Sequence, residues 1–277
     1  MKIKIVTDST CNLPQDLIEK HDISVVDLKI IIDGKVYRDS ELNVNDVVEA
    51  IKSDKDVRTS QPAVEDFTKV YEEALKRYDH VISIHLSSKT SGTMNAANLA
   101  AKNLNAEDKI TIFDSKFLSL ALGFIVLKAC ELSEKYNDVD IIINELEKYT
   151  ETIGGFFMVG NLDSIIKSGR ISKLKGRIAN MFGVTPIFTV TDGELDIVKI
   201  TLGRKRGFNE MIKIVKEKKN KLLDKLLGIV YLNTEDLVKK FVEKFEDELR
   251  FFKVLTTPSL AVHAGTELFA VILRTEG

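Results

Sequence analysis

Two clusters of hydroxyl side chains are the part of the sequence best suited to binding a ligand. Thr59-Ser60-Gln61-Pro62 precedes a helical pattern, with Pro62 expected in the first turn, and Ser87-Ser88-Lys89-Thr90-Ser91-Gly92-Thr93 precedes another. A hydroxyl group can simply cap each helix, with Ser60 or Gln61 serving the first. The second cluster is richer in hydroxyls than a cap requires, and Gly92 lets an anion approach the backbone closely. Because helix N-termini carry unpaired N–H donors and partial positive charge, the clusters could hold a carboxylate or a phosphate.

Motifs for nucleotide and metal chemistry are absent. No G-x-G-x-x-G follows a strand, and no G-x-x-x-x-G-K-[ST] is present, so nothing supports a common phosphate loop. The four histidines, His21, His80, His85 and His263, form no H-x-x-H or H-E-x-x-H pair. We therefore expect no metal site and no cofactor. His85 alternates with apolar residues and is expected to be a structural strand residue.

The first half alternates strands and helices. Short β-rich runs at 3–6, 81–86 and 110–113 each end in small polar residues, and helical patterns cover 64–78, 95–104 and 117–135. This order predicts an α/β fold in which a mostly parallel sheet is covered on both faces, giving three layers. In such sheets ligands bind beyond the carboxyl ends of the strands, where these polar clusters lie.

The character of the chain changes near Gly154-Gly155. A charged helix is expected over 138–152, followed by strands over 156–159, 184–190 and 194–201, the last two joined by an Asp192-Gly193 hairpin. A helix from about 209, a strand over 226–232, a helix over 235–250 and strands over 251–255 and 268–273 follow. We predict an N-terminal α/β domain over 1–152, a C-terminal α/β domain with a mixed sheet over 153–277, and a ligand between them.

Composition and charge exclude several classes of protein. The 277 residues include 40 basic and 42 acidic side chains, for a formal net charge of −2, which argues against broad nucleic-acid binding. Only Cys11 and Cys130 are present, so a disulfide framework is excluded. The N-terminus lacks the apolar core of a signal peptide, and the longest apolar stretch, 118–127, is too short to cross a bilayer. We expect a cytoplasmic protein without a transmembrane segment.

Several short motifs in register resemble the DegV family over essentially the whole chain. They are Thr7-Asp8-Ser9-Thr10 with Pro14, Thr59-Ser60-Gln61-Pro62, Ser87-Ser88 to Ser91-Gly92-Thr93, Asp114-Ser115, Leu162 to Ser172, Pro186-Ile187 and Asp192-Gly193-Glu194. The resemblance implies a two-domain protein that binds one long-chain fatty acid between its domains. It also implies a carrier without turnover of its own, which presents the carboxylate to a partner fatty acid kinase that makes acyl phosphate for phospholipid synthesis.

The resemblance also implies roles for individual residues. The carboxylate-binding hydroxyls match Thr59 or Ser60 and Ser91, with the backbone N–H groups of Gly92 and Thr93 nearby, and the late family histidine matches His263. The family's G-R-I-S arginine matches Arg170, and its R-x-R pair matches Arg204 and Arg206. We expect these arginines to dock the kinase or its nucleotide phosphates, away from the hydroxyl clusters. One departure stands out: Ala264-Gly265-Thr266-Glu267 follows His263, where the family has a small residue and Gly-Pro-Gly.

An acyl chain requires a long apolar slot. The candidates, each of which could equally be ordinary core, are Phe117, Leu118, Leu120, Leu122, Phe124, Phe156, Phe157, Met158, Ile165, Ile166, Met181, Phe182, Ile187 and Phe188. Each buried CH₂ contributes about 0.8 kcal/mol, so a chain of about 16 carbons gains roughly 12 kcal/mol before the costs of association.

Two alternative functions remain at the level of sequence. In a serine hydrolase Ser91 is the nucleophile, His263 the base, and Asp8 or Asp163 the orienting acid, although no G-x-S-x-G motif surrounds Ser91. In a small-molecule phosphotransferase the hydroxyl clusters bind phosphate, although the usual metal and phosphate-loop signatures are absent.

Overall fold

The first part of the chain forms a parallel sheet. The computed structural model of the protein describes residues 1–171, 174 and 183–276. The strands β1 (Ile3–Asp8), β2 (Ser24–Val26), β6 (His80–His85) and β7 (Ile110–Asp114) pair in the order β2-β1-β6-β7. Every pair is parallel. The polar loops that follow β1, β6 and β7 therefore meet at one edge, as the sequence predicts.

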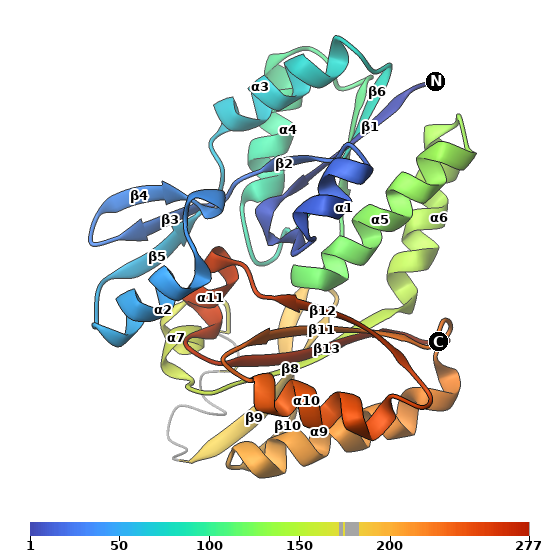
Figure 1. The fold of residues 1–277 in the computed structure, drawn as a ribbon. Coiled ribbons are helices and arrows are strands. Elements are labelled where there is room, and N and C mark those ends of the chain that lie inside the picture. The colour runs from blue at the N-terminus through green and yellow to red at the C-terminus, as the bar shows by residue number, and fades with distance from the viewer. Residues whose placement is uncertain (172–173, 175–182, 277) are drawn as a thin grey trace.

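Helices cover both faces of this sheet (Figure 1). On one face α3 (Val64–Leu75) and α4 (Thr93–Asn103) pack against Val6 and Val81. On the other face α5 (Ser119–Lys135) packs against Ile5 and Ile82, and α6 (Val139–Thr152) packs on α5. Successive strand residues point to opposite faces, so each strand contributes to both cores.

A small antiparallel sheet at the side of the molecule was not predicted. It has the order β4-β3-β5, from β3 (Lys29–Ile32), β4 (Lys35–Arg38) and β5 (Val57–Ser60), and α2 (Val44–Lys52) lies beside it. The β3–β4 turn is Asp33-Gly34, and both residues have positive φ, 49° and 82°. Two positive φ angles are what a two-residue type I′ hairpin turn requires. Thr59 and Ser60 thus end a strand of this sheet and not of the parallel one.

The rest of the chain builds a mixed sheet. The described strands are β8 (Ile153–Val159), β9 (Val184–Thr191), β10 (Glu194–Leu202), β11 (Leu226–Leu232), β12 (Arg250–Leu255) and β13 (Leu268–Arg274). Their order is β10-β9-β8-β13-β11-β12, with β11–β12 parallel and the other pairs antiparallel. The predicted fold class, α/β with a parallel sheet and a second mixed sheet, is confirmed.

The mixed sheet has helices on one face and the first half of the chain on the other (Figure 1). The helices α9 (Arg204–Lys218) and α10 (Glu235–Phe245) pack against Phe269 and Val271 of β13. On the opposite face, Gly228 of β11 lies so close to α5 that an added Cβ would come within 2.8 Å of Leu120. Among the described residues, the remaining helices are α1 (Gln15–Lys20), α7 (Asp163–Lys167), α11 (Pro258–Ala264) and the 3-10 turns at Ser9–Cys11, Asp39–Glu41 and Lys219–Lys221.

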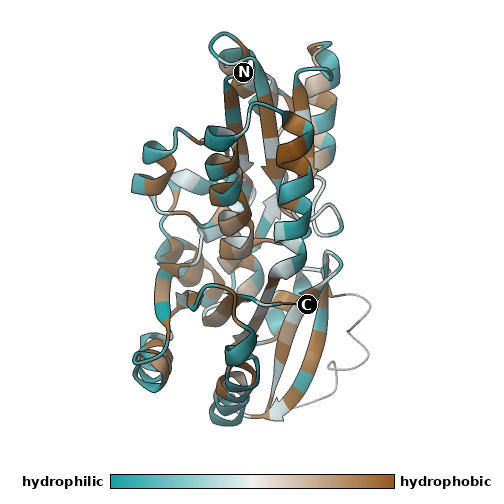
Figure 2. Ribbon diagram, turned by 90° about the vertical axis from the view of Figure 1, so that its right-hand side faces the viewer, coloured by the Kyte–Doolittle hydropathy of each residue, from teal (hydrophilic) through white to brown (hydrophobic). Residues whose placement is uncertain are grey.

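Figure 2 shows hydrophobic residues in the strands and hydrophilic residues along the outer faces of the helices. Within the described residues, no helix combines the length and the apolarity needed to cross a membrane. Several predicted bounds differ from the structure: α9 begins five residues before the predicted 209, and β8 begins three before 156. Because α6 ends at Thr152 and β8 starts at Ile153, the predicted domain boundary falls between two elements.

Candidate functional site

A largely apolar cavity lies between the parallel sheet and the mixed sheet. Its volume is about 150 Å³. From the first half of the chain, the loops after β1, β6 and β7 supply Thr10, Leu86 and Phe117, and β5 supplies Thr59. The second half supplies the opposite wall, for example Phe157 of β8, Val190 of β9, Leu195 of β10 and Ile272 of β13, together with residues of α7 and α11.

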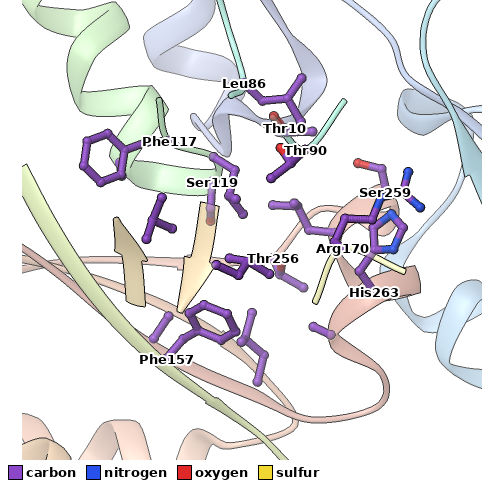
Figure 3. Close-up of a pocket in the computed structure, with 18 of the residues that line it drawn as sticks. Thr10, Leu86, Thr90, Phe117, Ser119, Phe157, Arg170, Thr256, Ser259 and His263 are labelled. Atoms are coloured by element: carbon purple, nitrogen blue, oxygen red, sulfur yellow. The ribbon is translucent and has the colours of Figure 1, made fainter. Parts of the chain in front are cut away.

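The two ends of the cavity differ in polarity. Figure 3 shows Arg170, Ser259 and His263 together at one end, and the rings of Phe117 and Phe157 toward the other. The polar end also includes Thr59, whose Oγ1 lies 2.8 Å from His263 Nε2. The structure therefore brings Thr59, Arg170 and His263, which were predicted from three distant motifs, together at one end of an apolar slot.

His263 lies in the last turn of α11, where its ring is held in the neutral state. Burial and the neighbouring Arg170 cation together lower the pKa of His263 from 6.5 to about 4. Among the described residues, no polar atom lies within hydrogen-bond distance of its buried Nδ1. A neutral ring that accepts from Thr59 at Nε2 carries its proton at Nδ1. In that tautomer Nδ1 is a buried donor without a partner, and an unsatisfied buried N–H is costly.

The loop that carries Ser91 is held by short-range bonds. Ser91 Oγ lies 2.9 Å from Thr93 Oγ1 and accepts from Thr93 N at 3.3 Å. Thr93 is completely buried and lies behind Ser91, outside the cavity wall. Gly92 is the N-cap of α4, and an added Cβ would come within 1.9 Å of Gln61 Oε1. Glycine at position 92 thus lets the two hydroxyl clusters approach each other.

The capping interpretation of the first cluster, one of the two that the sequence left open, is wrong. The N-cap of α3 is Ala63, so Pro62 precedes the helix, and the Asp66 carboxylate accepts from Ala63 N at 3.1 Å. Ser60 is exposed and Thr59 is directed to His263. The hydroxyls of this cluster are consequently free of the helix and available to the cavity.

A second, polar cavity of about 750 Å³ adjoins the first. Both cavities include Thr59, Ser60, Gln61, Thr90, Ser91, Ser168, Arg170 and Leu195 in their walls. The second adds Lys89, Gly92 and Glu194. It forms a polar vestibule at the end of the apolar slot that holds His263.

The structure separates slot residues from core residues among the apolar candidates. Phe117, Leu118, Phe156, Phe157 and Ile165 line the cavity. Leu120, Leu122, Phe124, Met158, Ile166, Ile187 and Phe188 pack in the hydrophobic cores instead. Met181 and Phe182 lie outside the described residues. The slot is also lined by apolar residues that no sequence motif predicted, namely Leu28, Leu86, Val190, Leu195, Leu260, Leu268, Ala270 and Ile272.

A buried carboxylate fixes α11 to the small sheet. Asp39, only 2% exposed, follows β4 and accepts from Ser259 N at 2.8 Å and from Ser259 Oγ at 2.5 Å. Burial raises the pKa of Asp39 to about 6. Since Ser259, Leu260, His263 and Ala264 of α11 all line the cavity, Asp39 helps to position this part of its wall.

The hydrolase arrangement suggested by the sequence is not formed by the described residues. Asp8 accepts from Thr10 and Leu86 and lies 3.0 Å from His85 Nδ1, and Asp163 accepts from Asn161. His85 Nε2 in turn lies 2.7 Å from Ser83 Oγ. This array of serine, histidine and aspartate is completely buried, and Ser83 accepts from Tyr71. It joins β1, β6 and α3 and has no access to a substrate.

Comparisons with known proteins agree with this geometry. The model of a family described as "Uncharacterised protein, DegV family" matches residues 2–276. The chain belongs to the DegV family. It is 33% identical over 277 residues to the DegV domain-containing protein SA1258 of Staphylococcus aureus strain N315, with 97% of each chain covered.

Solved DegV structures share the whole fold. A DegV family protein from Thermus thermophilus, described for its fatty acid binding, aligns with a TM-score of 0.90 at 29% identity, covering 100% of both chains. DegV of Bacillus subtilis, a fatty acid binding protein, aligns with a TM-score of 0.88 at 29% identity, covering 99% of this chain and 100% of the other.

The arginines of this DegV family member occupy two different environments. The expectation that Arg170 lies away from the hydroxyl clusters is wrong, since it lines both cavities with Thr59 and Ser91. It follows α7, which packs against α11, and this tertiary contact brings it to the site. Arg204, by contrast, lies 3.0 Å from Asp236 Oδ1 and 3.4 Å from Glu267 Oε2. Arg206 is exposed on α9.

The departure from the DegV pattern after His263 has a clear structural result. Gly265 ends α11 with a φ of 85°, and an added Cβ would lie 3.1 Å from Ser164 Oγ. Glu267 is paired with Arg204 and does not contribute to the pKa shift of His263. The carboxylate of Glu267, four residues after His263, therefore forms an ion pair with Arg204 outside the cavity.

Within the described residues, no group of three or more His, Cys, Asp or Glu side chains is arranged to hold a metal ion. The site offers hydroxyls, one neutral imidazole and one guanidinium at the end of an apolar slot. This combination can bind an amphipathic anion.

Proposed function

We propose that the protein binds one long-chain fatty acid, with its carboxylate near Thr59, Ser91, Arg170 and His263 and its acyl chain in the apolar slot. The observation that carries the proposal is the unpartnered, buried Nδ1 of His263 at the polar end of the cavity. A buried carboxylate must be paired and hydrogen-bonded to stay ionised. The His263 N–H, two hydroxyls and the Arg170 guanidinium meet that requirement. The solved DegV relatives described as fatty acid binding proteins support the same ligand class.

The test is to identify and then titrate the ligand. Lipid released from the denatured, purified protein is analysed by mass spectrometry, and fatty acid affinity is measured with the delipidated chain. Ser91→Ala should weaken binding roughly tenfold to a hundredfold, because a hydrogen bond to a charged group contributes about 1.5–3 kcal/mol. Thr68→Val, which removes a hydroxyl bonded within α3 and outside the cavity, is the matched control. Absence of fatty acid binding by the wild-type chain would refute the proposal.

We further propose that the protein is a carrier that presents the carboxylate to a partner fatty acid kinase in the cytoplasm, for acyl phosphate and phospholipid synthesis. Two domains, 1–152 and 153–277, would enclose the lipid. The polar vestibule supports this role, because it leaves a route from solvent to the head-group end of the slot. The test is formation of acyl phosphate from the loaded protein, ATP and the cognate kinase. The carrier should also leave Ser91 unlabelled by a fluorophosphonate, whereas a serine hydrolase would be labelled there.

A further inference from the structure

Ser87 ties together the loops that line the cavity. It is completely buried, and its N–H donates to Phe117 O at 2.8 Å. Its carbonyl accepts from Thr90 N at 3.0 Å and from Ser91 N at 3.2 Å. Since Phe117, Thr90 and Ser91 all line the cavity, the position of Ser87 sets the position of both loops.

The side chain of Ser87 also reaches the mixed sheet. Its Oγ donates to the carbonyl of Gly193 at 2.7 Å, across 106 positions of the chain. Gly193 and Asp192 form the turn between β9 and β10. Beside this bond, the Asp192 carboxylate lies 2.8 Å from Lys89 Nζ and 3.8 Å from Lys116 Nζ. The turn is thus bonded to both loops that Ser87 connects.

The contact is too close for any side chain at position 193. Gly193 has a φ of 80°, and an added Cβ would come within 2.6 Å of Ser87 Oγ. The strands that leave this turn carry Val190 and Leu195, which line the cavity. The hairpin therefore forms a wall of the slot, and its tip is fixed to the loop that carries Ser91.

We propose that this contact is a clasp, formed by Ser87, Lys89 and Lys116 with Asp192 and Gly193, which positions the Ser91 loop and holds the β9–β10 hairpin closed over the bound lipid. The proposal rests on the proposed function, because it assigns to the clasp the control of lipid release. A lipid enclosed between two walls can leave only when the walls separate. Opening at the clasp breaks one buried hydrogen bond and two exposed ion pairs.

The hydrogen bond and the ion pairs of the clasp should respond differently to salt. The buried Ser87–Gly193 bond is shielded from water, so salt has little effect on it. The ion pairs of Asp192 are exposed, so salt screens them and each contributes modestly. Lipid release should accordingly be faster at high salt, by about twofold to fivefold, with the buried bond retained as the main barrier.

A pair of glycine substitutions tests the steric part of the clasp. Gly193→Ala places a Cβ against Ser87, whereas Gly34→Ala, in the Asp33-Gly34 turn, introduces the same positive-φ strain with nothing within 4 Å. The dissociation of a fluorescent polyene fatty acid, displaced by excess oleate, is measured in both variants. We expect release several-fold faster than wild type in Gly193→Ala only. Equal release rates in the two variants would overturn the proposal.

The ion pairs of Asp192 are tested with a separate variant and a separate control. Asp192→Asn should speed release at low salt and abolish the salt dependence. Glu248→Gln removes a carboxylate from the ion pair with Lys219, outside the cavity. This variant should leave the release rate and its salt dependence unchanged. Unchanged salt dependence in Asp192→Asn would remove the ion pairs from the clasp and contradict the proposal as stated.

Hydrogen exchange separates failure of the clasp from failure of the proposed function. The amides of Thr90 and Ser91 bond to Ser87 O and should exchange faster in Gly193→Ala than in Gly34→Ala, with no lipid present. If the wild-type chain binds no fatty acid but this difference is found, the clasp stands as a structural device and the proposed ligand is wrong. Identical exchange in the two variants would refute the clasp whatever the ligand.

Discussion

Thr59 Oγ1 and His263 Nε2 lie 2.8 Å apart although 204 positions separate them in the chain. Thr59 lies in β5 of the small antiparallel sheet, and His263 lies in the last turn of α11. The bond joins the two halves of the chain at the polar end of the slot. A ring that accepts the Thr59 hydroxyl proton at Nε2 carries its own proton on Nδ1, and this is the tautomer that the proposed carboxylate site requires.

Thr59→Val should weaken fatty acid binding by about 1.5–3 kcal/mol, or roughly tenfold to a hundredfold, because the variant keeps the shape of Thr59 but loses its hydrogen bonds near a charged group. Titration of delipidated protein with a fluorescent fatty acid measures the effect. Thr59→Ser keeps the hydroxyl and should bind nearly as well as wild type. If valine and serine behave alike, the hydroxyl has no part in binding.

His263 should make the folded protein sensitive to acid. Its pKa is about 4 in the folded state and ordinarily 6.5, so the unfolded chain binds the extra proton between these values. The free energy of unfolding therefore decreases as the pH falls from about 6.5 to 4. His263 accounts for up to about 3 kcal/mol of this decrease. Urea unfolding of wild type and His263→Gln at several pH values tests this. The difference between the two chains should change across that window and be constant above pH 7.

Asp39 should have the opposite effect on the pH dependence of stability, because it destabilises the folded protein as the pH rises. Its pKa is raised from 3.8 to about 6, so the folded protein holds a proton that the unfolded chain has released. Its contribution to the free energy of unfolding falls as the pH rises from about 4 to 6, by up to about 3 kcal/mol. Asp39→Asn cannot ionise, so its stability relative to wild type should rise through the same window. A relative stability that is flat from pH 4 to 7 would show that Asp39 has an ordinary pKa.

Substitutions of Arg170 and of Arg204 should have different effects on fatty acid affinity. Arg170→Ala should lower fatty acid affinity several-fold, because Arg170 lines the polar end of the slot. It should also raise the pKa of His263, since the Arg170 cation contributes to its depression. Arg204→Ala breaks pairs with Asp236 and Glu267 outside the cavity and should leave both quantities unchanged. Titration calorimetry and histidine NMR measure them, and equal effects of the two variants would contradict this assignment.

The sequence was sufficient for three strands of the parallel sheet and their polar edge, whereas the short edge strand β2 was not predicted. Apolar runs with period two, each followed by hydroxyl or carboxyl residues, predict β1, β6 and β7 without knowledge of tertiary contacts. The β9–β10 hairpin was found from Asp192-Gly193. The same signal at Asp33-Gly34 was overlooked, which explains why the sheet that carries Thr59 was missed.

Other features of the site depend on tertiary packing. The helix α11 has only seven residues, too few for a periodic pattern, although Thr257 as N-cap and Pro258 at its start are recognisable signals. The position of Arg170 follows from the packing of α7 on α11, and the role of Asp39 from its contact with Ser259 220 positions away. No local pattern encodes such distances, so the sequence could not place Arg170 in the cavity wall or show that Asp39 holds α11.

The position of β13 in the mixed sheet has a consequence for biosynthesis. Although β13 spans Leu268–Arg274, it lies between β8 and β11 and joins the two groups of strands that precede it. Its residues Leu268, Ala270 and Ile272 also form part of the slot. While the chain emerges from the ribosome, β8–β10 and β11–β12 remain unconnected until this strand is made. The cavity is therefore complete only after synthesis of this segment, and a chain truncated before residue 268 would expose two open sheet edges prone to aggregation.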